Sequence, residues 1–276
     1  MKTGTDLGAS PLGRAVAYAE RYDPGLLFAV ERATQRAAFG LGAELPFRGA
    51  DVWNAYEASW LDGDGKPQVA IATFVVPADS QRLVESKSVK LYLASFNQQR
   101  FEAASVVRST IARDVSSATG ATVPVTLTLP PDFAELRREE LTGDSIDAEP
   151  LAAARYELSP ESLAAAGPTV AEALRSQLFR SVCPVTGQPD YASVRLAYRG
   201  ARIDRAGLLA YLVSFRRHAG FHEHCVERIF MDVWRRCRPD ALSVYARFTR
   251  RGGIDINPYR TSGDEPPPPN ARTARQ

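Results

Sequence analysis

The stretch Ser181-Val182-Cys183-Pro184-Val185-Thr186-Gly187-Gln188-Pro189-Asp190 sets a lone cysteine in a turn, with a carboxylate seven residues later. Residues 178–182 and 191–198, on either side of the turn, are rich in apolar and aromatic side chains. Two such runs around a loop that contains Pro and Gly are typical of a β-hairpin. The sequence therefore predicts two antiparallel strands with the thiol of Cys183 at their turn.

The same plan occurs in the first half of the chain. Residues 51–61 and 68–76 are apolar, aromatic and β-branched, and Asp62-Gly63-Asp64-Gly65-Lys66-Pro67 lies between them, which predicts another hairpin. Helical spacing follows over about 103–118, and then a strand over 122–129 that its internal proline confines to a sheet edge. Apolar spacing predicts four more elements: a short helix over 26–36, a helix marked by Leu208, Leu212 and Phe215, a helix over 226–234 and a strand over 242–248.

A weak internal repeat indicates a duplication of one module. Residues Leu91–Phe96 resemble Ala210–Phe215. If the chain contains two copies of one module, each copy would have kept part of a functional site. The alternative is that the short match arose by chance. The pairs of residues in this register include Glu85 with Asp204, Glu102 with His222 and Ala103 with Glu223.

Length and composition limit the class of protein. The 276 residues are 45% hydrophobic and 24% charged, which is enough for one large core or two small ones. The formal net charge of +2 gives no strong field toward nucleic acid or a membrane. Three cysteines at irregular spacing argue against a disulfide framework and for a reducing compartment. Because neither a signal peptide nor a membrane-spanning run is recognisable, we expect a soluble, cytoplasmic protein.

Changes in composition predict five segments. Residues 1–48 form an irregular arm, and residues 49–131 form a first module. Residues 132–170 are acidic and then rich in Ala and Pro, as expected of a linker. Residues 171–260 form a second module that carries the cysteine turn, and the Pro-rich tail 261–276 is expected to be disordered.

Four polar residues of the second module are candidates for chemistry. A thiolate at Cys183 would be a strong nucleophile, although a lone cysteine is more often a small buried hydrophobe. Asp190 is either a turn residue or, in a desolvated pocket, a proton donor. His222 and Glu223 begin a helix, where an acid is favoured in any case; as a pair they could instead bind the edge of a heterocycle. Neighbours expected in the core are Cys225 and Cys237, and those expected on a solvated or interface face are Glu227 and Arg228.

Two further motifs carry charge. One of them is Glu85-Ser86-Lys87-Ser88-Val89-Lys90-Leu91-Tyr92. It is either an exposed strand or the start of a helix, or it is a binding segment. In the second case its carboxylate would accept hydrogen bonds from substrate N–H groups, and its Ser and Lys side chains would donate to phosphate. The other is Arg250-Arg251-Gly252-Gly253. It is either a basic turn with no further role, or a binding segment that offers two guanidinium groups beside a glycine backbone that a ligand can approach. Zinc binding is an alternative with suitable ligand types but no compact ligand pair. Its candidate ligands are Cys183, His222, His224 and Cys225.

Four motifs follow one another along the chain: Glu85-Ser86-Lys87-Ser88-x-Lys90-Leu91-Tyr92, Cys183-Pro184-Val185-Thr186-x-Gln188-Pro189-Asp190, Phe221-His222-Glu223-x-Cys225-Val226-Glu227-Arg228 and Arg250-Arg251-Gly252-Gly253-x-Asp255-Ile256-Asn257-Pro258. Together they resemble the signatures of the NADPH-dependent 7-cyano-7-deazaguanine reductases, the nitrile reductases of queuosine biosynthesis. The likeness is to the long, two-module branch and runs from Asp51 to Arg260. It implies an α+β fold of tandem tunnelling-fold modules, with antiparallel sheets backed by helices, in a homodimer without a metal ion.

The resemblance also implies a reaction and a site. The nitrile of 7-cyano-7-deazaguanine would be reduced to an aminomethyl group through a covalent thioimide on Cys183, with Asp190 supplying a proton and two NADPH used per turnover. Because the substrate is a small molecule, we expect no direct contact with nucleic acid or a membrane. The substrate-binding residues implied are Val84, Glu85, Ser86, His222 and Glu223, and the NADPH-binding residues implied are Ser86, Lys87, Arg251 and Gly252.

Two other functions stay open at this point. A zinc-dependent GTP cyclohydrolase-like enzyme is similar in fold to those reductases, and stoichiometric zinc in the purified protein would favour it. A non-catalytic module for RNA or a nucleotide would use arginines such as Arg216, Arg217 and Arg250, and salt-sensitive RNA binding would favour it. The small net charge and the position of Cys183 weigh against the second function.

Overall fold

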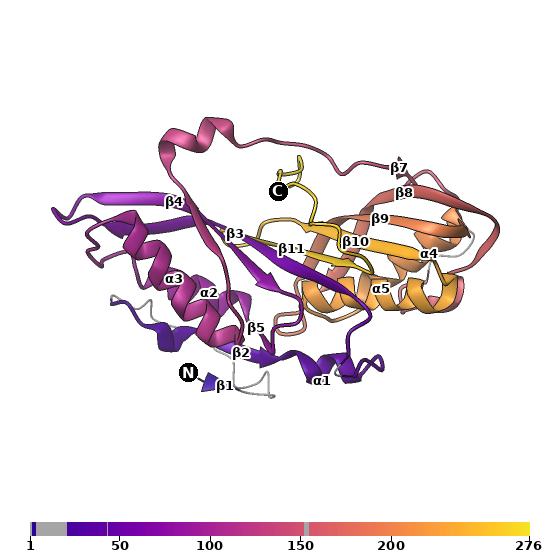
Figure 1. The fold of residues 1–276 in the computed structure, drawn as a ribbon, viewed down its shortest axis with the longest axis horizontal. Coiled ribbons are helices and arrows are strands. Elements are labelled where there is room, and N and C mark those ends of the chain that lie inside the picture. The colour runs from indigo at the N-terminus through magenta and orange to yellow at the C-terminus, as the bar shows by residue number, and fades with distance from the viewer. Residues whose placement is uncertain (1, 4–20, 43, 152–154) are drawn as a thin grey trace. The chain divides into compact units, whose positions relative to one another are not determined.

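The structure, a computed structural model, describes residues 2–3, 21–42, 44–151 and 155–276. The chain divides into two compact units. As far as their residues are described, the first unit contains residues 1–44, 51–136 and 250–256, and the second contains residues 45–50, 137–249 and 257–276. Both units have a hairpin, then two helices and then a further strand, in that order (Figure 1).

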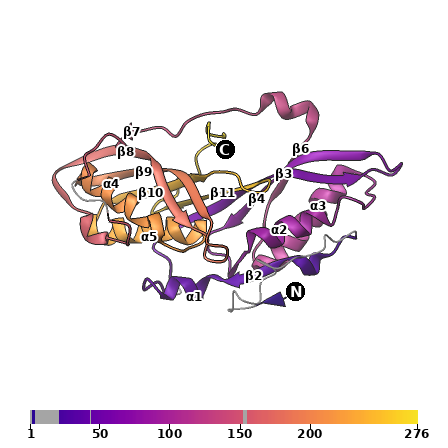
Figure 2. The same cartoon turned by 180° about the vertical axis from the view of Figure 1, so that it is seen from behind.

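The larger sheet of the first unit has the strand order β6-β4-β3. β3 (Arg48–Leu61), which begins within the second unit, and β4 (Pro67–Pro77) are the predicted hairpin. β6 (Val125–Thr128) pairs antiparallel with β4 at the sheet edge, as the proline in its sequence predicts. α2 (Ser86–Ala94) and α3 (Ala104–Thr119) lie on one side of this hairpin in both views (Figures 1 and 2).

A smaller sheet of the first unit has the order β1-β2-β5. Its strands are β1 (Lys2–Thr3), β2 (Phe28–Glu31) and β5 (Arg82–Val84), with β5 leading directly to α2. Other elements are α1 (Arg32–Ala37) and short 3-10 helices at Pro24–Leu26 and Pro130–Glu135. Residues 26–36 thus contain the whole of strand β2 and most of the short helix α1, so the predicted single helix is wrong.

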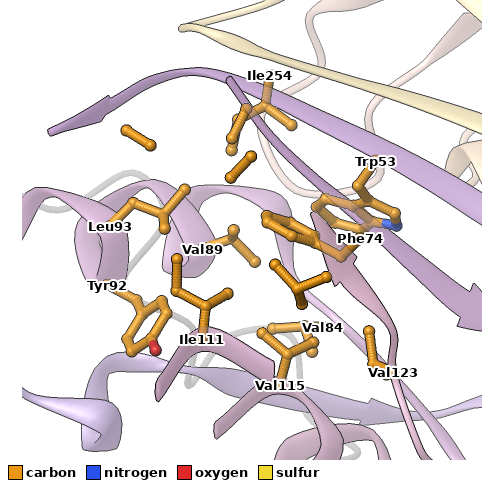
Figure 3. Packing of buried hydrophobic residues seen from close by; sticks show 14 of the residues in the cluster. Trp53, Phe74, Val84, Val89, Tyr92, Leu93, Ile111, Val115, Val123 and Ile254 are labelled. Atoms are coloured by element: carbon orange, nitrogen blue, oxygen red, sulfur yellow. The ribbon is translucent and has the colours of Figure 1, made fainter. Parts of the chain in front are cut away.

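The core of the first unit joins its helices to its hairpin (Figure 3). Trp53 of β3 and Phe74 of β4 lie with their ring centroids 6.3 Å apart. Ile111 and Val115 of α3 and Val89 of α2 are buried in the same cluster. The apolar positions of α3 recur at three- and four-residue intervals, which is why its helical span follows from the sequence. The structure confirms that helix to within a residue at each end.

The second unit has the strand order β11-β10-β9-β8-β7. β8 (Ala165–Val182) and β9 (Pro189–Ile203) form the hairpin around the cysteine turn, and their pairing extends far beyond the predicted segments. β10 (Ala241–Phe248) pairs antiparallel with β9 and with β11 (Ile254–Thr261), whereas the short β7 (Asp144–Ser145) runs parallel to β8.

Two helices cover one face of the second unit's sheet. α4 (Arg205–Ser214) and α5 (His222–Cys237) lie on the same side of β9 and β10 in both views (Figures 1 and 2). Short 3-10 helices occur at Pro160–Ser162 and Phe215–Arg217. Within the described residues no helix is both long and apolar enough to cross a membrane. Together with the first unit, this arrangement confirms the α+β class, with antiparallel sheets backed by helices, and agrees with tandem tunnelling-fold modules.

Each unit has the same hydrogen-bonded brace between its two helices. Tyr92 of α2 donates to Asp114 of α3 at 2.7 Å. Tyr211 of α4 donates to Asp232 of α5, also at 2.7 Å. Equivalent side chains therefore make equivalent contacts in both units, which supports the predicted duplication.

The last strand contains an ion pair that the sequence does not suggest. β11 is buried along its whole length, although its sequence is largely polar. Glu227 of α5, expected on a solvated or interface face, is instead fully buried within the second unit, and it accepts two hydrogen bonds from the guanidinium of Arg260, at 2.7 and 3.1 Å. The expectation for Glu227 is wrong because its cationic partner lies on a different element.

Candidate active site

Cys183 lies in the tight turn that joins β8 to β9. Its backbone N–H donates to the carbonyl of Gln188 at 2.8 Å, and its carbonyl accepts from Gly187 at 3.0 Å. Gly187 has φ +69°, in the left-handed region that favours glycine. The turn therefore presents a half-buried, free thiol at the end of the hairpin.

Asp190 lies seven residues further on, at the start of β9, and only 4% of it is exposed. Its Oδ2 is 3.4 Å from Nε2 of His222, the first residue of α5. The imidazole of His222 stacks flat on the ring of Phe248, with centroids 3.8 Å apart and an 8° angle between the planes. The ring is thus held between a carboxylate at its edge and an aromatic face beneath it.

The neighbouring acid and thiols of α5 have different environments. Glu223 is buried in the first turn of α5, where the helix dipole favours a carboxylate. Burial raises the pKa of the Cys225 thiol to about 12 and that of Cys237 to about 11. Both therefore stay protonated at neutral pH, and both lie in the core as expected. Cys183 is the thiol that a substrate can reach.

Residues 84–87 lie where β5 ends and α2 begins. Val84 is the last residue of β5 and is buried. Glu85 is the N-cap of α2, and its carboxylate accepts from the backbone N–H groups of Lys87 (2.7 Å) and Ser88 (2.9 Å). Burial raises the pKa of Glu85 in spite of these bonds. Since a carboxylate has about four lone-pair sites, two amide bonds leave it able to accept more.

Arg251 and Gly252 form a tight turn before β11. The backbone N–H of Arg251 donates to the carbonyl of Ile254 at 2.9 Å. Gly252 and Gly253 have φ +54° and +77°, so this backbone needs glycine at both positions. A Cβ at Gly252 would lie 2.7 Å from Nζ of Lys90. The turn therefore brings bare backbone up to an ammonium group.

β3 supports this turn from within the first unit. Asp255 is buried and accepts from Nδ2 of Asn54 at 2.8 Å and from the hydroxyl of Tyr56. The backbone N–H of Tyr56 donates to the carbonyl of Gly253 at 2.8 Å, and its ring lies 5.2 Å beneath the guanidinium of Arg250. Tyr56 thus contacts the turn three times: its backbone N–H contacts Gly253, its ring contacts Arg250 and its hydroxyl contacts Asp255.

A cavity of about 1090 Å³ opens beside the turn, within the first unit. Small-molecule sites usually have about 300–1,000 Å³, so this cavity is of the same order of size. The residues that line it and could bind phosphate or a base are Arg21, Lys90, Gly252, Gly253, Glu57, Asn97, Gln98 and Gln99.

The candidate zinc ligands do not form a metal site. Among the residues that the structure describes, no group of three or more His, Cys, Asp or Glu side chains could hold a metal ion. His224 and Cys225 are buried on α5.

Comparison with known proteins shows the family. Residues 18–127 match the family described as Nitrile reductase, 7-cyano-7-deazaguanine-reductase N-term, and residues 189–267 match the family described as QueF-like protein. The chain is 57% identical to the NADPH-dependent 7-cyano-7-deazaguanine reductase of Burkholderia mallei (strain SAVP1), over 97% of this chain and 98% of that protein. This chain belongs to the 7-cyano-7-deazaguanine reductase family.

Another curated relative and a solved structure also match this chain. The NADPH-dependent 7-cyano-7-deazaguanine reductase of Burkholderia multivorans (strain ATCC 17616 / 249) is 56% identical, again over 97% of this chain and 98% of that protein. A crystal structure of the archaeosine synthase QueF-Like in the apo form matches with a TM-score of 0.32 and 21% identity, covering 36% of this chain and 99% of that chain. A likeness of that size has no bearing on the fold.

The residues predicted for the reductase site fall into two groups. In the second unit the structure brings Asp190 and His222 together, with Cys183 on the same hairpin and Glu223 on the same helix. In the first unit it places 84–87 at the start of α2, and Gly252 against Lys90 of that helix.

Sequence reasoning misses several side chains that support the reductase residues. Phe248, beneath His222, is predicted only as part of a strand, and no local pattern pairs the two rings. Asp255 and Tyr56 hold the Gly252 turn, although only Asp255 lies within a recognised motif. The available signal is Asp255 itself, a charged residue between two isoleucines, since a charged side chain that is buried needs a partner.

Proposed function

We propose that this chain reduces the nitrile of 7-cyano-7-deazaguanine to an aminomethyl group with NADPH, through a covalent thioimide on Cys183. The observation that carries the proposal is the half-buried thiol of Cys183 in the turn of the hairpin whose strand β9 carries Asp190, which is held beside His222. The names of the relatives supply the substrate and the reductant. Zinc-dependent cyclohydrolase chemistry finds no support in these relatives.

In the proposed first step, Sγ of Cys183 bonds to the nitrile carbon while one π bond of the C≡N group opens. The nitrogen takes a proton from Asp190, and Asp190 regains one from the thiol, so that the thiol hydrogen ends on nitrogen. His222 orients the carboxyl group of Asp190, because their Nε2 and Oδ2 atoms lie 3.4 Å apart. The product of this step is a thioimide that joins the enzyme to the substrate.

NADPH, when bound, supplies hydride, and two equivalents are needed because a nitrile lies two two-electron reductions above an amine. The role of Cys183 is to leave after the first reduction: its C–S bond breaks, the thiol takes back a proton, and an imine remains for the second reduction. The surrounding side chains must exclude water, which would hydrolyse that imine.

The turn at Gly252 and the cavity beside it fit a phosphorylated cofactor. The bare backbone of Gly252 allows close approach, and the ammonium group of Lys90 lies next to it. We assign Ser86, Lys87, Arg251 and Gly252 to NADPH binding. Support comes from their position in the first unit at the start of α2 and in the turn that borders the cavity.

Polar side chains are proposed to recognise the deazaguanine ring. Each of the carboxylates Glu85 and Glu223 would accept N–H bonds from a guanine-like edge, and His222 would donate or accept one. Val84 and Ser86, on either side of Glu85, complete the proposed substrate-binding residues. Both carboxylates are buried, which strengthens hydrogen bonds made to them.

We further propose a cytoplasmic homodimer that acts on the free base. The three free cysteines support a reducing compartment, and the net charge of +2 supports a small-molecule substrate over nucleic acid. The proposed module boundaries are 49–131 and 171–260, with 132–170 between them. Light scattering of the purified protein would test the dimer, since a monomer mass would contradict it.

Mass spectrometry tests the covalent step. Enzyme incubated with 7-cyano-7-deazaguanine and no NADPH should gain the mass of the nitrile. Cys183→Ala should not gain it, whereas the matched variant Cys237→Ala, which loses a buried thiol elsewhere, should. Asp190→Asn should bind the nitrile but form the adduct far more slowly, because the proton donor is lost. With NADPH present, two equivalents should be oxidised per amine formed; an enzyme that turns over yet never carries the adduct would refute the mechanism.

A further inference from the structure

The side-chain amide of Gln276 is buried in the second unit, with 9% of the residue exposed. Its Oε1 accepts from Nε of Arg247 (2.7 Å) and from the backbone N–H of Thr273 (3.1 Å). Its Nε2 donates to the carbonyl of Phe248 (2.9 Å) and to Oδ1 of Asn257 (2.8 Å). Because two partners donate and two accept, only one orientation of the amide satisfies all four.

This amide rests on a buried cation of β10. Arg247 is 1% exposed, and besides Gln276 it donates to the hydroxyl of Tyr245 (2.8 Å) and to Oδ1 of Asn270 (2.9 Å). All three acceptors are uncharged, and two of them come from the tail. Burial of a guanidinium costs free energy unless its N–H groups find acceptors; these three residues supply acceptors for Nε and Nη1 of Arg247, whereas its Nη2 has none among the described residues. The tail residues therefore form part of the environment that keeps Arg247 inside.

The same end of β10 supports the histidine of the candidate site. Phe248, whose carbonyl accepts from Gln276, carries the ring on which His222 stacks at 3.8 Å. Phe248 also pairs in register with Ala192, two residues beyond Asp190 on β9. A shift of the Phe248 backbone would therefore move the face beneath His222 and the strand that carries Asp190.

A weaker contact joins the tail to the catalytic hairpin. Arg275 donates to the carbonyl of Gln177 on β8 at 2.7 Å. Its guanidinium also lies 5.8 Å from the ring centroid of Tyr191, the residue after Asp190. Because Arg275 is exposed, this contact contributes little by itself. It shows that the tail touches the hairpin as well as β10.

We propose that Gln276 is a positioning residue for the His222–Asp190 pair, acting through Phe248 and Arg247. Its amide hydrogen-bonds both the carbonyl of Phe248 and the side chain of Asn257 on β11. It thereby fixes the position of the Phe248 ring, on which His222 stacks, and so keeps His222 within reach of Asp190. This also gives Asn257, in the last recognised motif, a role as an acceptor for that amide. The effect on turnover rests on the proposed function, whereas the effect on the His222 ring does not.

The test compares Gln276→Ala, Gln276→Glu and the control Gln81→Ala, which removes an exposed amide from the first unit. The Glu variant keeps an acceptor for Arg247, so it should fold even if the Ala variant does not. It has no donor for Phe248 or Asn257, so it still breaks the proposed link. Proton NMR would follow the ring protons of His222, which the stacked ring of Phe248 shifts upfield; the chain has three histidines, and a His222→Gln spectrum identifies the signal.

The proposal expects the upfield shift of His222 to shrink in each folded Gln276 variant and to stay unchanged in Gln81→Ala. It also expects kcat/KM for 7-cyano-7-deazaguanine to fall about tenfold, the factor that about 1.4 kcal/mol produces. A folded Gln276→Glu with the wild-type His222 shift would overturn the proposal and leave Gln276 as a packing contact only. A changed shift in an enzyme whose wild type reduces no nitrile would uphold the positioning role and refute the proposed function instead.

Discussion

Gly252→Ala should weaken NADPH binding in addition to its cost to the fold. The residue has φ +54°, where a Cβ costs roughly 1–2 kcal/mol of the free energy of unfolding. The new Cβ would also lie 2.7 Å from Nζ of Lys90, which is closer than the two atoms can approach. Because Nζ is the mobile end of a long side chain, the ammonium group would move away while the backbone stays. Displacement of the Lys90 ammonium group should therefore weaken the binding of NADPH rather than lower the stability further.

The magnitude for binding follows from the contact that would be lost. A hydrogen bond to a charged group contributes about 1.5–3 kcal/mol, so the Kd for NADPH should rise roughly 10- to 150-fold. Fluorescence titration with NADPH would measure the Kd, and urea unfolding would measure the stability.

Gly167→Ala is the matched control for this prediction. Gly167 has φ +85°, and a Cβ there meets nothing within 4 Å. It should lose the same roughly 1–2 kcal/mol of stability with an unchanged Kd for NADPH. If Gly252→Ala binds NADPH as the wild type does, or if both variants lose affinity equally, then Lys90 and the Gly252 turn do not form the cofactor site.

Three other substitutions test buried polar groups. Burial raises the pKa of Glu85 above 4.5, and a carboxyl group with a raised pKa in the folded state destabilises the protein as pH rises through that pKa. The free energy of unfolding measured with urea should therefore decline above about pH 4.5, and Glu85→Gln should remove this decline. The same pH dependence in the variant and the wild type would contradict this. Tyr211→Phe takes a donor from Asp232 and should cost about 1–3 kcal/mol in thermal unfolding; an unchanged melting temperature would mean that the brace is unimportant. Arg260→Leu removes the guanidinium that donates two hydrogen bonds to the buried Glu227 and should cost about 3–5 kcal/mol. A second change, Glu227→Leu, should restore most of this loss; a double variant as unstable as the single one would contradict the pairing.

The elements that sequence predicts well are those with local causes. The hairpin of β3 and β4 follows from apolar runs around the turn at 62–67. The span of α3 follows from apolar residues at helical intervals, with Gly120 in the left-handed conformation at its end. In both cases the residues that decide the structure lie within a few positions of one another. The same holds for the cysteine turn, whose Gly187 permits the tight reversal between β8 and β9.

The features that sequence misses depend on distant partners. β11 does not look like a buried strand because Arg260 lies within it, yet the charge is matched by Glu227, 33 positions away in the chain. Composition predicts disorder for the tail, whereas Gln276 reaches Arg247, 29 positions away. A polar residue is buried only when another element supplies its partner, and one sequence does not say which element that is. Even the four motifs of the candidate site identify the site residues only, and they do not predict which other residues contact them.

The two units share a contact between their helices but not the residues proposed for the chemistry. Asp114 and Asp232 occupy the same position in α3 and α5, counted from the first residue of each helix, and each is braced by the tyrosine of the preceding helix. Counted in this way, the first residue of α3, Ala104, stands opposite His222, two positions beyond the pairing that sequence similarity alone predicts. The brace is thus present in both units, while the imidazole occurs in one. Since the brace needs neither His222 nor a thiol, the first unit can keep a complete helix pair and supply a different surface, the turn and cavity at Gly252, without any loss of its core.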